Sequence, residues 1–212
     1  MTSPRILVQL SDPHIKHPGA LAYGKVDTAQ FFAKAIRQIT QMKQPVDAIV
    51  ITGDLTDFGR VEEYQHLRQL LAPLTSPVYL LPGNHDCRIA MRQVIADYHY
   101  LQTNVVDAEH DCMQYAINLN GVRLVTVDTV VPMASHGEVS PRRLDHLAQL
   151  LAADTHTPTI VAMHHPPFRT HIGHMDKVGL LSGADALQKL IDRKSTRLNS
   201  SHSTLSRMPS SA

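Results

Sequence analysis

Short apolar runs alternate with segments of helical periodicity in the first half of the chain. The apolar runs are residues 5–10, 48–51 and 78–81, and each ends at a polar or glycine-containing segment, which is typical of buried strands that end in turns. Between them, residues 26–42 and 62–71 carry apolar side chains three or four positions apart, which predicts helices. With a further helix at about residues 88–98, this order predicts parallel strands joined by helices.

The second half of the chain departs from this alternation. Two apolar runs, residues 113–119 and 122–128, are joined by Asn-Gly, which strongly indicates a β-hairpin. Periodicity predicts helices at residues 140–153 and from about 184 to 191, and an apolar run predicts a strand at 159–163. Hairpin and crossover units together predict an α/β fold of two stacked sheets with helices outside.

Composition and charge narrow the class of protein. Hydrophobic residues make up 43% and charged residues 18%, which indicates a globular chain, and the net charge of +1 implies no polyanionic or membrane partner. Cys87 and Cys112 are the only cysteines, which argues against a disulfide framework. No signal-length or membrane-spanning apolar run is seen, so a cytoplasmic location is expected. Fourteen histidines raise the expectation of a metal site.

Metal-ligating residue types directly follow four of the predicted strands. Asp12 and His14 follow the first strand, Asp54 the second, Asn84 the third and His164 the strand at 159–163. Each residue alone is at least as well explained as a turn former or a cap, and for Asp54 and Asn84 that explanation is favoured. Their recurrence at four strand ends favours one shared site, because ligands of open α/β sheets bind beyond the carboxyl ends of the strands.

The motifs at residues 11–14, 53–57, 83–86 and 163–167 resemble those of the calcineurin-like metallophosphoesterases. Within that family the chain is most similar to the bacterial class III cyclic-nucleotide and glycerophosphodiester phosphodiesterases. The resemblance covers roughly residues 5–191. It implies an αββα sandwich of two mixed sheets flanked by helices, incomplete at the C-terminus, with a two-metal centre between the sheet ends.

The resemblance also implies roles for the ligand residues. Asp12 and His14 would bind the first metal, Asn84 and His164 the second, and Asp54 would bridge both. This mixed nitrogen and oxygen ligation suits Fe, Mn, Zn or Co rather than Ca or Mg. Two such ions would neutralise a phosphodiester and hold a bridging hydroxide for in-line attack on phosphorus.

A general acid is implied as well. His85 resembles the acid of the family and would protonate the leaving oxygen, and Asp57 would orient and charge the His85 imidazole through its carboxylate. A purely structural His85 remains an alternative. His165 is interpreted as a structural histidine, and residues 173–176 as a loop on the substrate side.

Two features of the C-terminal region depart from the family pattern. The last family motif, Gly-His-x-His, which supplies one histidine to each metal, is absent. Residues 192–212 are rich in Ser and Arg and lack apolar periodicity, and they can be back-translated into codons that resemble a sequencing-library adapter. We therefore expect a truncated metallophosphoesterase domain at 1–191, a non-native disordered tail at 192–212, and weakened metal binding.

These observations predict a dinuclear metal-dependent phosphodiesterase. The expected substrate is a small molecule, either a 3',5'-cyclic nucleotide or a glycerophosphodiester. The alternatives are a phosphomonoesterase or nucleotide pyrophosphatase on the same scaffold, or a non-catalytic binding module without metals. No membrane or nucleic-acid polymer is expected as a partner, and a homodimer is left open.

Overall fold

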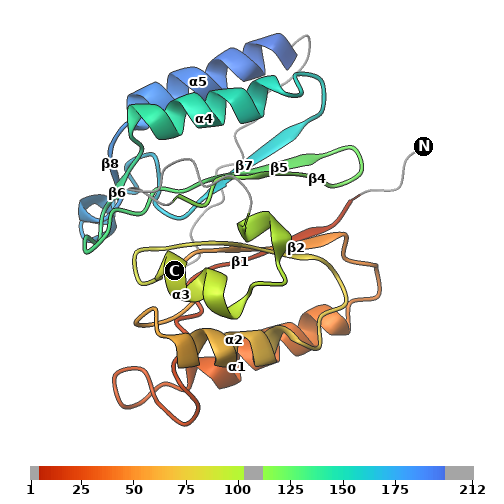
Figure 1. The fold of residues 1–212 in the computed structure, drawn as a ribbon, viewed down its shortest axis with the longest axis vertical. Coiled ribbons are helices and arrows are strands. Elements are labelled where there is room, and N and C mark those ends of the chain that lie inside the picture. Colours follow the sequence, from red (N-terminus) through yellow and green to blue (C-terminus); the bar gives the residue numbers. More distant parts are fainter. Residues whose placement is uncertain (1–4, 103–111, 199–212) are drawn as a thin grey trace.

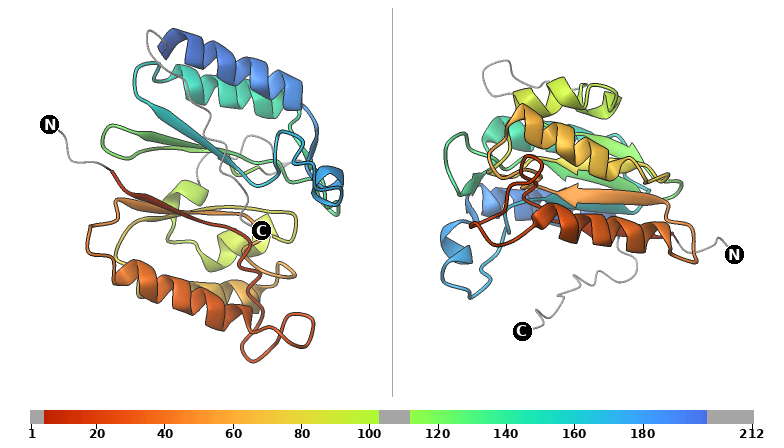
Figure 2. Two further views of the ribbon diagram at one scale, coloured as in Figure 1. Left: turned by 180° about the vertical axis from the view of Figure 1, so that it is seen from behind. Right: turned by 90° about the horizontal axis from the view of Figure 1, so that it is seen from below.

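The computed structural model describes residues 5–102 and 112–198 of the chain, with side chains up to Arg193. Two stacked β-sheets lie between outer layers of helices, as Figures 1 and 2 show. This arrangement confirms the predicted α/β sandwich. No helix in the described part of the chain combines the length and the apolar character needed to cross a membrane.

The first sheet is parallel and has the strand order β1-β2-β3. Its strands are β1 (Leu7–Leu10), β2 (Ala48–Thr52) and β3 (Val78–Leu81), all within the predicted runs or one residue beyond them. All five residues of β2 are buried, because this strand is central in the sheet and both faces are covered. Its apolar character on both faces explains the continuous hydrophobic run in the sequence.

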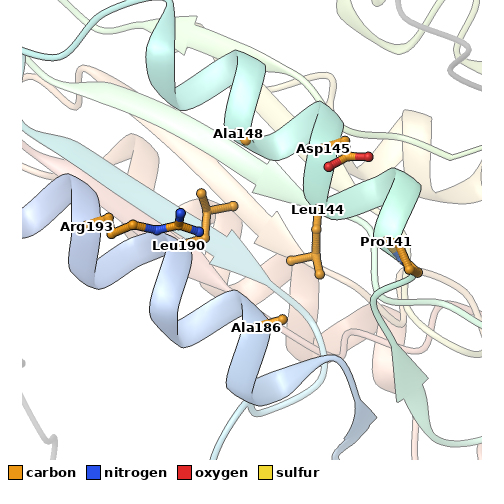
Figure 3. A pocket seen from close by; sticks show the side chains of 7 residues that line it. All are labelled: Pro141, Leu144, Asp145, Ala148, Ala186, Leu190 and Arg193. Atoms are coloured by element: carbon orange, nitrogen blue, oxygen red, sulfur yellow. The ribbon is translucent and has the colours of Figure 1, made fainter.

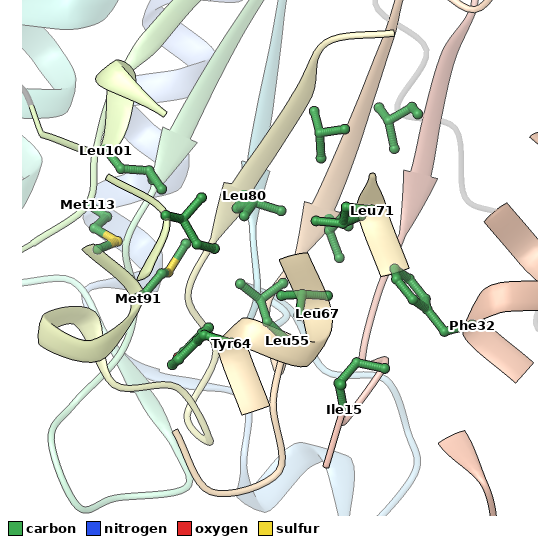
Figure 4. Close-up of a cluster of buried hydrophobic side chains, with 14 of the residues drawn as sticks. Ile15, Phe32, Leu55, Tyr64, Leu67, Leu71, Leu80, Met91, Leu101 and Met113 are labelled. Carbon is green, nitrogen blue, oxygen red and sulfur yellow. The ribbon is translucent and has the colours of Figure 1, made fainter. Parts of the chain in front are cut away.

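Three helices pack on the first sheet: α1 (Thr28–Thr40), α2 (Val61–Leu71) and α3 (Arg88–Val94). Asp27 caps α1 by accepting a hydrogen bond from the backbone N–H of Gln30. The core between the helices and the sheet includes Tyr64 and Leu67, which are fully buried (Figure 4). The helix predicted at 88–98 is shorter than expected, and a 3-10 turn at His99–Leu101 follows it.

The second sheet is mixed and has the order β4-β5-β7. The hairpin strands β4 (Ala116–Asn118) and β5 (Arg123–Val127) are antiparallel, and β7 (Thr159–Met163) pairs in parallel with β5. Both residues of the Asn120-Gly121 turn have positive φ, as the predicted hairpin requires. Of the two sheets, only this one is mixed, whereas the resemblance implied two mixed sheets.

Two long helices cover the outer face of the second sheet (Figure 1). The first, α4 (Pro141–Ala152), is capped by Ser140, which accepts a hydrogen bond from the N–H of Arg143. The second, α5 (Ala184–Leu198), continues past the predicted end at Ile191, so residues 192–198 are helical and not disordered. Arg, Lys and Leu favour helix propagation, which explains the extension. Residues 199–212 lie outside the described part.

Two short strands form a third sheet that the sequence pattern did not predict. They are β6 (Gly137–Glu138) and β8 (Leu180–Ser182), which pair in parallel. Segments of two and three residues are too short to show periodicity. Neither Cys87 nor Cys112 forms a disulfide bond in the described part of the chain.

The two large sheets pack face to face through apolar side chains from both. Val50 of β2 and Leu81 of β3 contact a cluster that includes Leu124 of β5 and Ala162 of β7. This stacking brings the carboxyl end of β7 next to those of the first sheet, and so places residues more than 100 positions apart in one site.

Candidate metal centre

The Asp54 carboxylate lies at the centre of the predicted ligands. One of its oxygens, Oδ1, is 3.4 Å from His164 Nε2, and the other, Oδ2, is 3.5 Å from His14 Nε2. Asn84 Oδ1 is 3.3 Å from His164 Nε2. A carboxylate with a different histidine beside each oxygen has the arrangement that a bridge between two metal ions requires.

Two groups of metal-ligating atoms share Asp54. One consists of Asp12, Asp54 and His164, and the other of His14, Asp54 and His85; within each group the ligand atoms lie within 4.8 Å of one another. The structure thus brings all the predicted ligands to one place. It groups Asp12 with His164, whereas the resemblance pairs Asp12 with His14, and it adds His85 as a neighbour of His14.

Three histidines present the same nitrogen to Asp54. Nδ1 of His164 is 2.9 Å from the carbonyl oxygen of Thr52, and Nδ1 of His85 is 2.8 Å from that of Asp57. A carbonyl can only accept, so these Nδ1 atoms carry the proton and the lone pair of Nε2 is free toward the site. His14 differs, because its Nδ1 lies 3.5 Å from an Asp57 carboxylate oxygen and makes no hydrogen bond with the described residues. Holding the distal nitrogen, as in His164 and His85, is typical of metal-ligating histidines.

The contacts of Asp57 differ from the prediction. The Asp57 carboxylate forms an ion pair with Lys16 and lies beside His14, while His85 donates to the backbone carbonyl of Asp57. The expected carboxylate–imidazole pair between Asp57 and His85 is therefore not formed. The predicted triad-like role for the carboxylate was wrong, because the side chain turns toward Lys16. The Nζ atom of Lys16 in turn lies over the ring of Phe58, 4.3 Å from the ring centre.

The backbone at the site adopts conformations that most residues avoid. Asp12, His14 and Asp54 have φ values of 54°, 43° and 48°, in the left-handed region. Such strain persists where the surrounding structure enforces it, and it is concentrated at functional sites. Gly83 allows the loops to approach: a Cβ there would lie 2.2 Å from both the backbone nitrogen and Oδ1 of Asp54.

The donor set fits metal ions. Two ligand atoms that each lie about 2.1 Å from a tetrahedral ion are roughly 3.4 Å apart. The His164–Asp54 and His14–Asp54 separations of 3.4 and 3.5 Å match that spacing. A buried carboxylate, histidine nitrogens and an amide oxygen form a mixed donor set, and such a set suits transition metals better than Ca or Mg.

His165, next to a predicted ligand, has a different environment. It is 2% exposed, and its Nδ1 lies 2.7 Å from Thr129 Oγ1. Burial, with a smaller contribution from His164, lowers the pKa of His165 to about 4, so the ring is neutral near pH 7. These contacts support its interpretation as a structural histidine.

Asp86 is a residue whose contribution the sequence reasoning missed, although it ends the motif at 83–86. Its partly buried carboxylate accepts hydrogen bonds from the loop that follows Asp54 and from its own loop. Burial, with a smaller contribution from the Asp54 charge, raises the pKa of Asp86. The position of Asp86 within the motif at 83–86 was the sequence signal that could have revealed this contribution.

The loop predicted to lie on the substrate side is organised by Asp176. The Asp176 carboxylate accepts hydrogen bonds from the backbone nitrogen and the hydroxyl of Thr170, at 2.6 and 2.8 Å. Phe168 and Ile172 in the same loop are exposed. Asp176 thus stabilises the loop, and a substrate-side role for residues 173–176 stays a prediction.

A hollow of about 240 Å³ lies elsewhere, between α4 and α5 (Figure 3). Its lining is mostly apolar, with Asp145 and Arg193 as its charged residues. None of the predicted metal ligands lines it, so it plays no part in the candidate centre.

Comparisons with known proteins show a family match over most of the chain. The family model described as calcineurin-like phosphoesterase matches residues 6–198. The probable glycerophosphodiester phosphodiesterase GpdQ of Arcobacter nitrofigilis is 32% identical over 188 residues, which cover 89% of this chain and 67% of that protein. The cAMP/cGMP dual specificity phosphodiesterase of Mycobacterium tuberculosis is 34% identical over 166 residues, covering 76% of this chain and 50% of that protein.

A third relative is the glycerophosphodiester phosphodiesterase GpdQ of Enterobacter lignolyticus. It is 29% identical over 188 residues, which cover 89% of this chain and 66% of that protein. The chain therefore spans between half and about two thirds of the length of these curated relatives.

Proposed function

The chain belongs to the calcineurin-like phosphoesterase family, and from this premise we propose that it is a metal-dependent phosphodiesterase acting on a small phosphodiester. The observation that carries the proposal is the Asp54 carboxylate, with His14 beside one oxygen and His164 beside the other. The names of the relatives suggest two substrate classes, 3',5'-cyclic nucleotides and glycerophosphodiesters. We retain both.

We assign two transition-metal ions, of the Fe, Mn, Zn or Co class, to this centre. Asp54 would bridge them, with Asp12, His14, Asn84 and His164 as the remaining ligands. When bound, the ions would neutralise the phosphate charge and activate water. The two groups that share Asp54 support this assignment, whichever ion Asp12 joins.

The chain's own residues then act on the leaving group. His85 is more exposed than the other site histidines, and its Nδ1–H is held by the Asp57 carbonyl, so Nε2 faces the site. A protonated Nε2 would donate its proton to the leaving alkoxide. Asp57 would contribute through two contacts, because its carbonyl orients His85 and its carboxylate lies beside His14 Nδ1.

A second role for His85 is favoured by one observation. Its Nε2 lies 4.0 Å from Asp54 Oδ2 and belongs to the same group as His14, so it could serve as a ligand of that ion. An acid must be free to protonate, whereas a ligand must stay neutral. Metal content of a His85 variant therefore separates the two roles.

A panel of substrates and metals tests the proposed function. The chain is stripped with a chelator, reloaded with Mn²⁺, Fe²⁺ or Zn²⁺, and assayed on cyclic AMP, glycerophosphodiesters, phosphomonoesters and a dinucleotide pyrophosphate. Metal-dependent cleavage of the first two classes supports the proposal. Preference for monoesters or pyrophosphates would favour the rival activities, and metal binding without turnover would favour a binding module. A cytoplasmic location and a homodimer stay predictions.

A further inference from the structure

Asp86 connects the two loops that carry the central ligands. Its Oδ2 accepts a hydrogen bond from the backbone nitrogen of Leu55 at 2.9 Å and from that of Gly83 at 2.9 Å. Its Oδ1 accepts from the backbone nitrogen of Thr56 at 3.1 Å. Leu55 and Thr56 directly follow Asp54, so a single carboxylate holds the backbone on both sides of the site.

The connection is reciprocal. Asp54 Oδ1 accepts a hydrogen bond from the backbone nitrogen of His85 at 3.0 Å. Each loop therefore supplies a carboxylate that binds amides of the other loop. Bonds from backbone amides to a carboxylate are strong, and three of them between the two loops restrict the relative movement of the loops.

Two hydroxyl groups also contact the Asp86 carboxylate and orient it. Tyr64 donates to Asp86 Oδ1 at 2.9 Å and accepts from the backbone nitrogen of Cys87, and Thr56 Oγ1 is 3.2 Å from the same Asp86 oxygen. All these donors are neutral groups, so they fix the rotamer of the carboxylate and leave its charge in place.

We propose that Asp86 is a positioning residue that sets the separation between Asp54 and Asn84, and thereby the spacing of the two metal ions. Gly83 directly precedes Asn84, and Leu55 directly follows Asp54, so a shift of Asp86 would move both ligands. The proposal rests on the proposed two-metal centre. It concerns metal geometry rather than turnover, and can be tested without a substrate.

The test uses Mn²⁺ and the full chain. The hydrogen bonds that Asp86 accepts from the backbone amides of Leu55, Thr56 and Gly83 are called the amide brace below. Asp86→Asn replaces one acceptor oxygen with an NH₂ group that meets amide donors, so the brace must break on one side. We expect a 10- to 100-fold weaker Mn²⁺ affinity by calorimetry, on the order reported for residues that hold metal ligands. We also expect the exchange-coupled EPR signal of paired Mn²⁺ to be lost or altered in Asp86→Asn.

Tyr64→Phe is the matched control. It removes a hydroxyl from the same carboxylate but leaves the amide brace intact, so it should lower thermal stability while retaining the coupled Mn²⁺ signal. Equal Mn²⁺ affinity and coupling in wild type and folded Asp86→Asn would overturn the proposal. Equal losses in both variants would do the same, because they would indicate general destabilisation.

Amide exchange in the wild-type chain tests the proposal without any variant. In metal-free protein, the amides of Leu55, Thr56 and Gly83 should exchange with solvent far more slowly than exposed loop amides. Fast exchange at these three positions would overturn the brace even if Asp86→Asn failed to fold. A wild-type chain that bound one Mn²⁺ with slow amide exchange would refute the two-metal proposal and retain the brace.

Discussion

Asp54 is buried to 5% exposure, yet its two oxygens face histidines from the segments that follow two different strands, β1 and β7. We expect Asp54→Asn to lose most of its bound metal, because a neutral amide cannot bridge two cations as a carboxylate does. The fold should survive, since the apolar residues of β2 hold the strand. Metal analysis together with circular dichroism checks this, and two retained ions in the variant would contradict the bridging role.

A variant of His85 distinguishes a general-acid role of this residue from a role as a metal ligand. If it is the general acid, His85→Gln should lower kcat by about 10²–10⁴-fold and leave metal content unchanged. The loss should shrink for substrates with a nitrophenolate leaving group, which needs no proton. Equal losses for good and poor leaving groups, or loss of one metal ion, would instead favour the ligand role.

Gly83 tests the close approach of the ligand loops. Gly83→Ala places a methyl group 2.2 Å from the nitrogen and Oδ1 of Asp54, so either the loop or the ligand must move. We expect metal affinity to fall by at least tenfold, on the order seen when the supports of ligands are removed. Gly173→Ala is the control, because its Cβ would meet nothing within 4 Å. Comparable affinities in the two variants would show that the loops adapt.

At the scale of elements, His165 couples the end of β7 to the segments around Thr129 and Gly137. Its pKa is about 4 when folded and about 6.5 in an unfolded chain, so the unfolded chain binds more protons between these values. The metal-free protein should therefore lose stability as pH falls from about 6.5 to 4, by roughly 2–3 kcal/mol from this residue.

Denaturant unfolding across this pH range measures the effect. His165→Gln cannot bind the proton and should flatten the pH dependence by that amount. An identical slope in the variant would assign the acid sensitivity to other groups.

At the scale of the molecule, a buried ion pair connects the two halves of the sandwich. Arg88 at the start of α3 donates to both carboxylate oxygens of Asp128, which follows β5, at 2.7 and 2.6 Å. Asp128 is fully buried, and the Arg88 charge beside it lowers its pKa even though burial alone would raise it. Removing the cation leaves a buried charge, which typically costs about 3–5 kcal/mol.

We therefore expect Arg88→Met to lower the free energy of unfolding by about 3 kcal/mol or more. Arg68→Met is the control, because the Arg68–Asp97 pair is more than half exposed and should contribute about 1 kcal/mol or less. Urea unfolding of both variants provides the comparison. Similar losses would show that Arg88 does not join the halves in the way its contacts indicate.

Hydrophobic periodicity determined much of the fold. The strand runs at 48–51, 78–81 and 159–163 and the Asn-Gly hairpin appear at the predicted places, because burial periodicity and turn chemistry act over a few residues. The polar residues at the strand ends also indicated one site, since parallel strands deliver their carboxyl ends to a common edge.

The tertiary structure decided which atoms of those residues meet. The Asp57 carboxylate turns to Lys16 and its carbonyl receives His85, 28 positions away, while Asp86 binds amides 30 and 31 positions away. The pairing of β6 with β8 likewise joins segments more than 40 residues apart. Sequence patterns report local conformation and burial, whereas these contacts depend on how separate loops approach one another once the two sheets have stacked.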